Sequence, residues 1–183
     1  MAQLYGGTFP DADTGWVTST DNILIHTSDG GLNWKPLTIE APRIDLRDAF
    51  FIDSLKGWVI ARNKGGIYST TDGGKQWETQ PTASDNRYRS IRFLNESEGW
   101  AAGLRYVNDS RDRAAVLLHT TDGGRNWSEV ETGVKERFFE RVLFYDQAHG
   151  WLVARDTIYA TKDAGKSWQL VLTLPLIESS QAK

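Results

Sequence analysis

The chain has 183 residues, with 21 basic and 24 acidic side chains and a formal net charge of −3. This near-neutral balance argues against a general nucleic-acid-binding protein, which usually carries a strong basic excess. The absence of cysteine excludes disulfide scaffolds, thiolate metal sites and cysteine nucleophiles. No apolar run approaches the roughly 20 residues that span a bilayer, so we expect no direct membrane insertion.

Three landmarks recur four times along the chain, always in the same order. A phenylalanine comes first, a Gly-Trp pair begins six residues later, and the motif Thr-x-Asp-Gly-Gly-x-x-Trp closes the copy, with Ala164 in place of its first glycine in the last copy. Such regular repetition is typical of solenoids and propellers. The phenylalanines are Phe9, Phe51, Phe93 and Phe144, and the Gly-Trp tryptophans are Trp16, Trp58, Trp100 and Trp151.

Each copy predicts four short strands. The first strand ends near the phenylalanine, as in 48–52, 90–94 and 141–145, and a turn bounded by Asp or Asn and by Gly follows it. The second strand starts at the Gly-Trp pair, the third (23–27 in the first copy) leads into the closing motif, and the fourth begins near the closing tryptophan. Units of about 40–45 residues with four strands are typical of propeller blades. The sequence therefore predicts an all-β fold, a β-propeller of four-stranded antiparallel blades, without helices.

The four predicted blades span about 3–42, 43–85, 86–134 and 135–177 of a single domain that covers 1–183. Closed propellers have four to eight blades, so three arrangements stay open. The chain is a segment of a larger propeller, or two copies form an eight-bladed ring, or the four blades close into a small ring. We favour the first two. Because an open arc exposes apolar blade faces, self-association is one expected kind of partnership.

The closing motif has a structural role in this fold. Its aspartate can accept hydrogen bonds from backbone N–H groups of its own turn, its second glycine supplies a positive φ, and its tryptophan folds back over the hairpin. The motif recurs in every blade, whereas a catalytic acid would occur in one place, so we interpret the motif as one that stabilises the turn. The residues concerned are Asp29, Trp34, Asp72, Trp77, Asp122, Trp127, Asp163 and Trp168.

The closing motif resembles the Asp-box, or BNR repeat, whose form is Ser/Thr-x-Asp-x-Gly-x-Thr/Ser-Trp. Together with the Gly-Trp strand and the His/Tyr-x-Thr-x-Asp-Gly-Gly lead-in, the pattern is most similar to the photosystem II stability and assembly factor family, from Phe9 to Trp168. This resemblance implies a propeller that docks membrane-protein subunits through an arginine-lined face. It also implies an extracytoplasmic location (periplasmic, lumenal or secreted), although we expect no signal peptide in the starting residues MAQLYGG. Asp-boxes also occur in sialidases, sortilin-type receptors and xyloglucanase-like enzymes.

Catalytic and metal sites find little support in the residues. The string nearest to a sialidase arginine motif, 42–45, follows the first Asp-box and lacks the final proline. His26 and His119 have equivalent positions in different blades, too far apart to share a metal ion, and we expect no metal and no cofactor. A glycosidase would need a pair of carboxylates, but no motif singles one out among Asp45, Asp48, Asp85, Glu136 and Glu140. A glycan-binding or glycoside-hydrolysing protein stays as the alternative function.

Charge is distributed unequally between the two rims of the predicted propeller. The rim with the first-to-second and third-to-fourth strand turns is mostly acidic, whereas the opposite rim is rich in arginine, which suits bidentate contacts with a partner. Arg47 and Arg89 have the same place in their strands, and an insertion at 106–113 extends the same rim. The equivalent residues in the other two blades are Tyr5 and Glu140. The candidate partner-binding residues are Arg43, Arg47, Arg62, Arg87, Arg89, Arg105, Arg111, Arg113 and Arg137.

These observations predict a non-enzymatic scaffold that binds a protein partner through its arginine-rich rim, in the manner of an assembly factor. A membrane-protein subunit is the partner that the resemblance implies, and no nucleic acid is expected. A structural repeat module within a larger surface protein is a further alternative.

Overall fold

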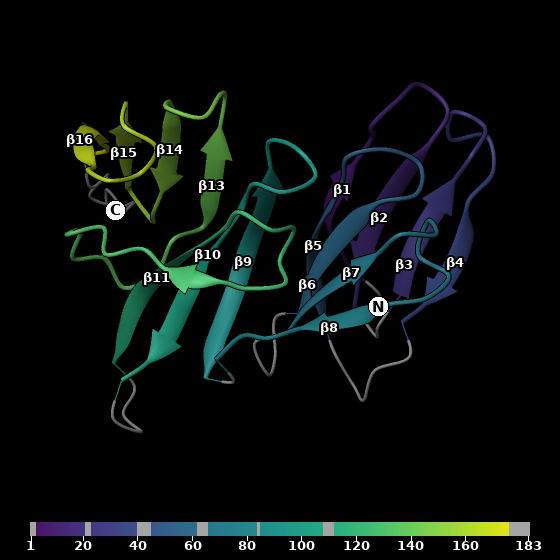
Figure 1. Cartoon of the computed structure of the whole chain (residues 1–183), viewed down its shortest axis with the longest axis horizontal. Coiled ribbons are helices and arrows are strands. Elements are labelled where there is room, and N and C mark those ends of the chain that lie inside the picture. The colour runs from purple at the N-terminus through teal and green to yellow at the C-terminus, as the bar shows by residue number, and fades with distance from the viewer. Residues whose placement is uncertain are drawn as a thin grey trace, which may run out of the picture.

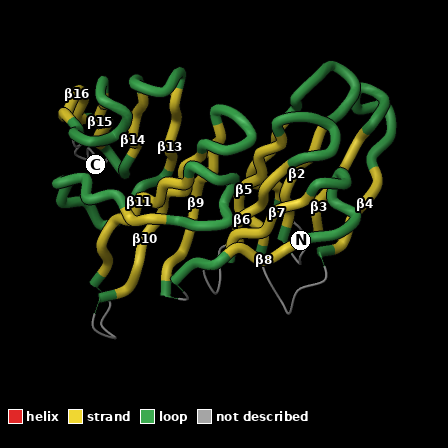
Figure 2. The backbone as a smooth tube through the Cα atoms, in the orientation of Figure 1, coloured by secondary structure: helices red, strands yellow, loops and turns green. Residues whose placement is uncertain are grey.

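The computed structural model describes residues 3–20, 23–39, 45–61, 66–83, 85–107 and 112–175. These residues form four antiparallel sheets of four strands each and contain no helix. Figure 1 shows the sheets following one another along an arc, and Figure 2 shows strands joined by loops throughout. The fold is a partial β-propeller, which confirms the predicted fold class. Within the described segments no helix is therefore available to cross a membrane.

In the first two blades the strands pair in chain order, from the inside of the arc to the outside. Blade 1 contains β1 (Leu4–Thr8), β2 (Gly15–Ser19), β3 (Ile23–Thr27) and β4 (Lys35–Thr38). Blade 2 contains β5 (Leu46–Phe51), β6 (Gly57–Ala61), β7 (Ile67–Thr70) and β8 (Glu78–Gln80).

The third and fourth blades repeat this order. Blade 3 contains β9 (Asn86–Phe93), β10 (Gly99–Tyr106), β11 (Arg113–Thr120) and β12 (Ser128–Glu129), and blade 4 contains β13 (Arg141–Phe144), β14 (Gly150–Val153), β15 (Thr157–Thr161) and β16 (Gln169–Thr173). The hairpin β10–β11 is the longest because Tyr106 pairs with Arg113, so both ends of the inserted segment belong to strands. Strand β9 begins at Asn86, before its predicted start, since Asn86 pairs with Arg105 on the lengthened β10.

The two kinds of tight turn in each blade lie on the same rim. In every blade a backbone N–H of the Asp-box turn donates to a carbonyl of the first-to-second strand turn, with N···O distances between 2.8 and 3.0 Å. The four pairs are Gly30 with Asp13, Gly73 with Leu55, Gly123 with Ser97, and Ala164 with Ala148. The Asp-box rim is therefore a continuous edge, opposite the rim where the candidate arginines were expected.

Each Asp-box turn is held by local hydrogen bonds. In blade 3, Oδ1 of Asp122 accepts from the backbone N–H of Asn126 (2.9 Å) and the hydroxyl of Thr120 (2.9 Å), and Oδ2 accepts from the Asn126 amide (2.8 Å). These donors lower the pKa of Asp122 to about 2. Both residues after the aspartate have positive φ. Glycine supplies this conformation in the first three blades, whereas Ala164 adopts a φ of 63° in blade 4.

The core lies between the blades and is built from the landmark aromatic residues. The Gly-Trp tryptophan of one blade stacks on the landmark phenylalanine of the next, an arrangement that we call the Trp–Phe junction. The stacked pairs are Trp16 with Phe51 (ring centroids 3.8 Å apart), Trp58 with Phe93 (3.6 Å) and Trp100 with Phe144 (3.7 Å). In the first two junctions the indole N–H also donates to the carbonyl of the next blade's first Asp-box glycine, Gly73 (3.4 Å) and Gly123 (3.0 Å).

The glycine of each Gly-Trp pair leaves room for a phenylalanine ring of its own blade. Gly57 is paired with Phe51 across β5 and β6, and a Cβ on Gly57 would lie 2.4 Å from Cδ1 of that ring. No real Cβ approaches another atom so closely, so only glycine fits beside the ring. The constant six-residue spacing between the phenylalanine and the glycine is therefore a consequence of this cross-strand packing.

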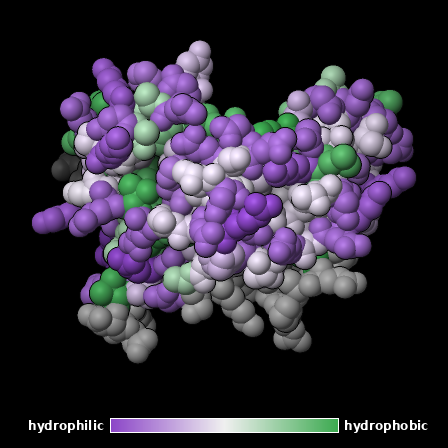
Figure 3. All heavy atoms as spheres, viewed as in Figure 1, coloured by the Kyte–Doolittle hydropathy of each residue, from purple (hydrophilic) through white to green (hydrophobic). Residues whose placement is uncertain are grey.

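The arc is open between its first and last blades. Inner strand β1 packs against β5, β5 against β9, and β9 against β13, but within the described residues no comparable packing joins β13 to β1. The space-filling view shows a concave gap in the outline between these two ends (Figure 3). The small closed four-bladed ring, one of the three arrangements left open by the sequence, is not the arrangement observed.

Candidate functional site: an arginine-lined hollow on the inner strands

One buried carboxylate ties the inner strands of three blades together. Oδ2 of Asp48 accepts from the guanidinium groups of Arg92 (2.9 Å) and Arg141 (3.4 Å). Backbone N–H groups of Ile91 (3.2 Å) and Ala49 (3.1 Å) donate to the same carboxylate. Burial raises the pKa of Asp48, and the two arginines and the N–H groups oppose this effect. Because its partners lie on the inner strands of blades 2, 3 and 4, we interpret Asp48 as the group that holds these three strands together.

β-Bulges occur at the equivalent place in the first three inner strands. In β9 the pairing with β10 skips Arg89, and in β5 the pairing with β6 skips Arg47. In β1 the register shifts between Leu4 and Gly7. A bulge adds an unpaired residue and re-aims its side chain. Because the pairing is interrupted at both arginines, their side chains leave the normal alternation of the strand.

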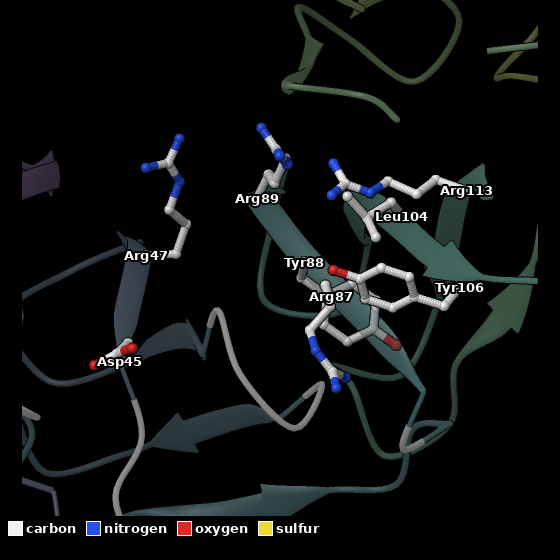
Figure 4. Close-up of a pocket in the computed structure, with 8 residues that line it drawn as sticks. All are labelled: Asp45, Arg47, Arg87, Tyr88, Arg89, Leu104, Tyr106 and Arg113. Carbon is white, nitrogen blue, oxygen red and sulfur yellow. The ribbon is translucent and has the colours of Figure 1, made fainter. Parts of the chain in front are cut away.

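Glycine allows the bulge in β9. Gly103 on β10 faces the bulge, and a Cβ at this position would lie 2.1 Å from the carbonyl oxygen of Arg87. The bulge also separates two arginines that would share a face of a regular strand. Figure 4 shows the guanidinium groups of Arg47, Arg89 and Arg113 extending to one side, whereas that of Arg87 extends to the other.

Ion pairing and ring contacts hold the re-aimed arginines in place. Glu140 lies directly before β13 and contacts both arginines. Its Oε1 lies 3.7 Å from Nη2 of Arg47, and its Oε2 accepts a hydrogen bond from Nη1 of Arg89. The Arg47 guanidinium also lies 5.1 Å from the ring centroid of Tyr5, and that of Arg89 lies 4.4 Å from the ring centroid of Phe138. The four residues predicted to share one register thus form a connected set on the inner side of the arc.

A hollow of about 270 Å³ lies beside these ion pairs, between blades 2 and 3. Four predicted residues line it, namely Arg47, Arg87, Arg89 and Arg113. The wall between them is formed by Tyr88, Leu104 and Tyr106, and Asp45 is the one carboxylate among the described residues of the lining. The Arg113 guanidinium lies 5.5 Å from the ring centroid of Tyr106. The site therefore combines an excess of positive charge with an aromatic and apolar wall.

Two further candidate arginines, Arg105 and Arg137, are not among the described residues that line this hollow. Arg105 forms an ion pair with Glu129 (2.7 Å). Arg137 lines a second hollow of about 450 Å³, which shares Arg113 with the first. Three further candidates, Arg43, Arg62 and Arg111, lie outside the described residues. The structure thus brings together four of the nine arginines that the sequence singled out.

Sequence reasoning did not select the wall of the hollow. Tyr88 stands between Arg87 and Arg89 in the sequence, and its side chain is buried. In a regular strand its side chain would point to the opposite face from both arginines. The bulge brings Tyr88 to the edge of the hollow, and the glycine at 103 was the available signal, since an isolated strand glycine often marks a bulge. Tyr106 belongs to the inserted segment, which sequence reasoning did place on this rim.

Three of the five carboxylates considered for other chemistry, and two histidines, are engaged in contacts within the fold. Asp48 and Glu140 bind arginines, as described above, and Glu136 accepts hydrogen bonds from the hydroxyl groups of Thr157 (2.8 Å) and Tyr159 (2.9 Å). The rings of His26 and His119 each lie 4.7 Å from a Gly-Trp indole, Trp16 and Trp100 respectively. Burial, together with Lys35, lowers the pKa of His26.

Fold and site define an Asp-box partial β-propeller with an arginine-lined inner hollow. The family model described as Photosynthesis system II assembly factor YCF48 matches residues 43–137, and the chain belongs to this family. The Photosystem II assembly lipoprotein Ycf48 of Synechococcus sp. (strain CC9902) is 26% identical over 147 residues, which cover 79% of this chain and 41% of the relative. The chain thus spans about two fifths of the length of this curated relative.

Solved structures show the same fold. The structure of YCF48 bound to D1 peptide superposes with a TM-score of 0.70 at 21% identity, over 93% of this chain and 55% of that one. An ancestral GH74 enzyme superposes with a TM-score of 0.74 at 17% identity, over 92% of this chain and 24% of that one. At such identities these likenesses establish the propeller fold alone, because one fold supports many activities.

Proposed function

We propose that this chain is a non-enzymatic scaffold that holds a segment of a protein partner in the arginine-lined hollow. One observation carries the proposal: bulges turn Arg47 and Arg89 to the side on which Arg113 also extends. A row of guanidinium groups suits carboxylates, which arginine binds with two parallel hydrogen bonds. The aromatic and apolar wall beside the row suits neighbouring apolar side chains. The expected ligand is therefore an acidic peptide segment.

The volume of the hollow and the ion pairs beside it support a macromolecular ligand. Its volume of about 270 Å³ is slightly below the range of roughly 300–1,000 Å³ that is usual for small-molecule sites. It therefore suits one or two side chains of a longer segment. Glu140 forms ion pairs with Arg47 and Arg89, which reduces the ordering that a ligand would otherwise impose on two flexible side chains.

The relatives favour a partner from the assembly of a membrane complex. Their names connect them with photosystem II assembly, and one YCF48 structure holds a D1 peptide. We extend this to the present chain as a proposal: the segment bound in the hollow belongs to a membrane-protein subunit during assembly.

Binding of a fluorescein-labelled D1 peptide, followed by fluorescence anisotropy, tests this function. The double variant Arg89→Gln/Arg113→Gln removes two guanidinium groups but keeps an amide that can donate to Glu140. Each charged hydrogen bond contributes about 1.5–3 kcal/mol, so Kd should rise at least tenfold. The control Lys75→Gln/Arg125→Gln removes the same charge from the Asp-box rim and should leave Kd unchanged. Equal Kd values for the two double variants would overturn the proposal.

A further inference from the structure

The second hollow, of about 450 Å³, lies next to the first and reaches onto blade 4. It shares Arg113, at the start of β11, with the first hollow. Arg137 and Phe138 come from the segment between β12 and β13, and Arg155 comes from the turn between β14 and β15. The described lining residues of the two hollows together include six arginines and three carboxylates. The excess of positive charge is therefore not confined to the first hollow.

One segment, 136–140, contributes contacts to both hollows. Phe138 lines the second hollow, and the guanidinium group of Arg89, which lines the first, lies 4.4 Å from the Phe138 ring centroid. Glu140, two residues later, forms ion pairs with Arg47 and Arg89. The contact between Arg89 and Phe138 thus joins the wall of one hollow to the wall of the other.

Hydrogen bonds to blade 3 fix the backbone of the same segment. The N–H of Phe139 donates to the carbonyl of Gly103 on β10 (3.0 Å), and the N–H of Ala115 on β11 donates to the carbonyl of Glu136 (2.9 Å). The ring of Phe139 is also buried in the core between blades 3 and 4. Because both the backbone and a buried ring hold this segment, the two hollows keep a fixed position relative to each other.

Arg113 and Arg155 are the guanidinium groups of the second hollow that are available to a ligand. Both residues are exposed, and neither forms an ion pair with a carboxylate of the described residues. Glu136 also lines this hollow, but its Oε1 accepts hydrogen bonds from the hydroxyl groups of Thr157 (2.8 Å) and Tyr159 (2.9 Å). The hollow therefore offers two arginines to a carboxylate from outside the chain.

We propose that the second hollow is a second subsite for the acidic segment, in which Arg113 and Arg155 bind a further carboxylate beside the Phe138 ring. This inference rests on the proposed function and adds that the segment crosses from blade 3 to blade 4. Because segment 136–140 fixes the position of both hollows, the ligand must carry its two acidic residues at a matching spacing. Once the first carboxylate is bound, the second binds intramolecularly, which raises the affinity of the whole segment.

Arg155→Gln tests the second subsite, because Arg155 is exposed in a turn and lines the second hollow but not the first. The Kd of the fluorescein-labelled D1 peptide, measured by anisotropy, should rise about fivefold or more. Lys162→Gln is the matched control, since it removes one positive charge from an exposed residue of the same blade on the Asp-box rim, and it should leave Kd unchanged.

Arg89→Gln separates failure of this inference from failure of the proposed function. If Arg89→Gln raises Kd while Arg155→Gln and Lys162→Gln give the same Kd, the second subsite is wrong and the proposed function stands. If neither Arg89→Gln nor Arg155→Gln changes Kd, both proposals are overturned.

Shortened D1 peptides distinguish a second subsite from a general attraction between charges. Truncation from one end should yield a peptide that wild type and Arg155→Gln bind equally but that Arg89→Gln still binds more weakly. Truncation from the other end should yield the reverse. If every truncation reduces the effects of Arg89→Gln and Arg155→Gln together, the two arginines act on one bound group, and the inference of a second subsite is overturned.

Discussion

Replacing Trp58 by alanine should destabilise the fold far more than the same change at Trp151, although both residues follow a glycine in the same motif. Trp58 is fully buried, stacks on Phe93 at 3.6 Å and donates to the carbonyl of Gly123 at 3.0 Å. Large-to-small changes at buried aromatic residues cost about 3–5 kcal/mol. Since this one also leaves a carbonyl without its donor, we expect a loss of about 4–5 kcal/mol.

Trp151 provides the internal comparison. Trp151 is 38% exposed and has no landmark phenylalanine of a following blade to stack on within the described residues. Burial of a complete large apolar side chain contributes about 1.5–3 kcal/mol. The partial burial of Trp151 then corresponds to about 1–2 kcal/mol.

Urea unfolding followed by far-ultraviolet circular dichroism measures both losses. Unfolding should be measured at protein concentrations at which light scattering shows a monomer, so that association does not add to the stability of the wild type. Equal m-values for the variants would show that the difference lies in stability rather than in the extent of unfolding. Equal losses for Trp58→Ala and Trp151→Ala would refute the account of the blade junctions.

Three further changes test the local structure. Gly57→Ala should cost about 1–3 kcal/mol in urea unfolding, because the new Cβ would meet the Phe51 ring at 2.4 Å; a loss of only a few tenths would contradict this packing. Ala164→Gly should raise the melting temperature by the equivalent of about 1 kcal/mol, because it relieves a φ of 63° on a residue with a Cβ; an unchanged or lower melting temperature would count against it. Hydrogen bonds lower the pKa of Asp122 and Asp163 to about 2, from ordinary values of 3.8. Their contribution to stability should therefore be complete above about pH 4 and decline as the pH falls towards 2. Thermal unfolding across this range should show a shallower decline for Asp122→Asn than for the wild type, and identical slopes would contradict the role of these hydrogen bonds.

The fold was predictable because its constraints are local and repeated. Phe51, Gly57 and Trp58 mark two paired strands and the contact with the next blade, and the Asp-box marks the turn on the same rim. Each signal occurs four times, so a single sequence supplies its own comparison. The positive φ of the first Asp-box glycine was missed, since Asp-Gly turns of several types need only one such residue.

The site was predictable only in part, because it depends on contacts between blades. The shared register of Arg47 and Arg89 was visible in the sequence, but the bulges that re-aim them were not. The buried Asp48 network depends on how β5, β9 and β13 converge, and nothing in the spacing of Arg92 and Arg141 shows that they meet one carboxylate. Likewise, composition could not distinguish an arginine held by a local partner, such as Arg105, from those that line the hollow.

The difference between local sequence signals and contacts between blades also explains the two ends of the arc. Trp151 and Phe9 have the same sequence context as their buried counterparts, so sequence alone assigns them the same role. Their exposure follows from the open arrangement of the blades, which is a property of the whole arc.

Photo-cross-linking tests the proposed function most directly, because it reports where a ligand lies. Benzoylphenylalanine would replace Tyr106 in the wall of the hollow or, as the control, Tyr145 on the opposite rim, both of which are exposed. Irradiation with a D1 peptide should yield a covalent adduct at position 106, suppressed by excess unlabelled peptide, and little at position 145. Equal adducts at both positions, or an adduct at position 145 alone, would contradict the assignment of the arginine-lined hollow as the partner-binding site.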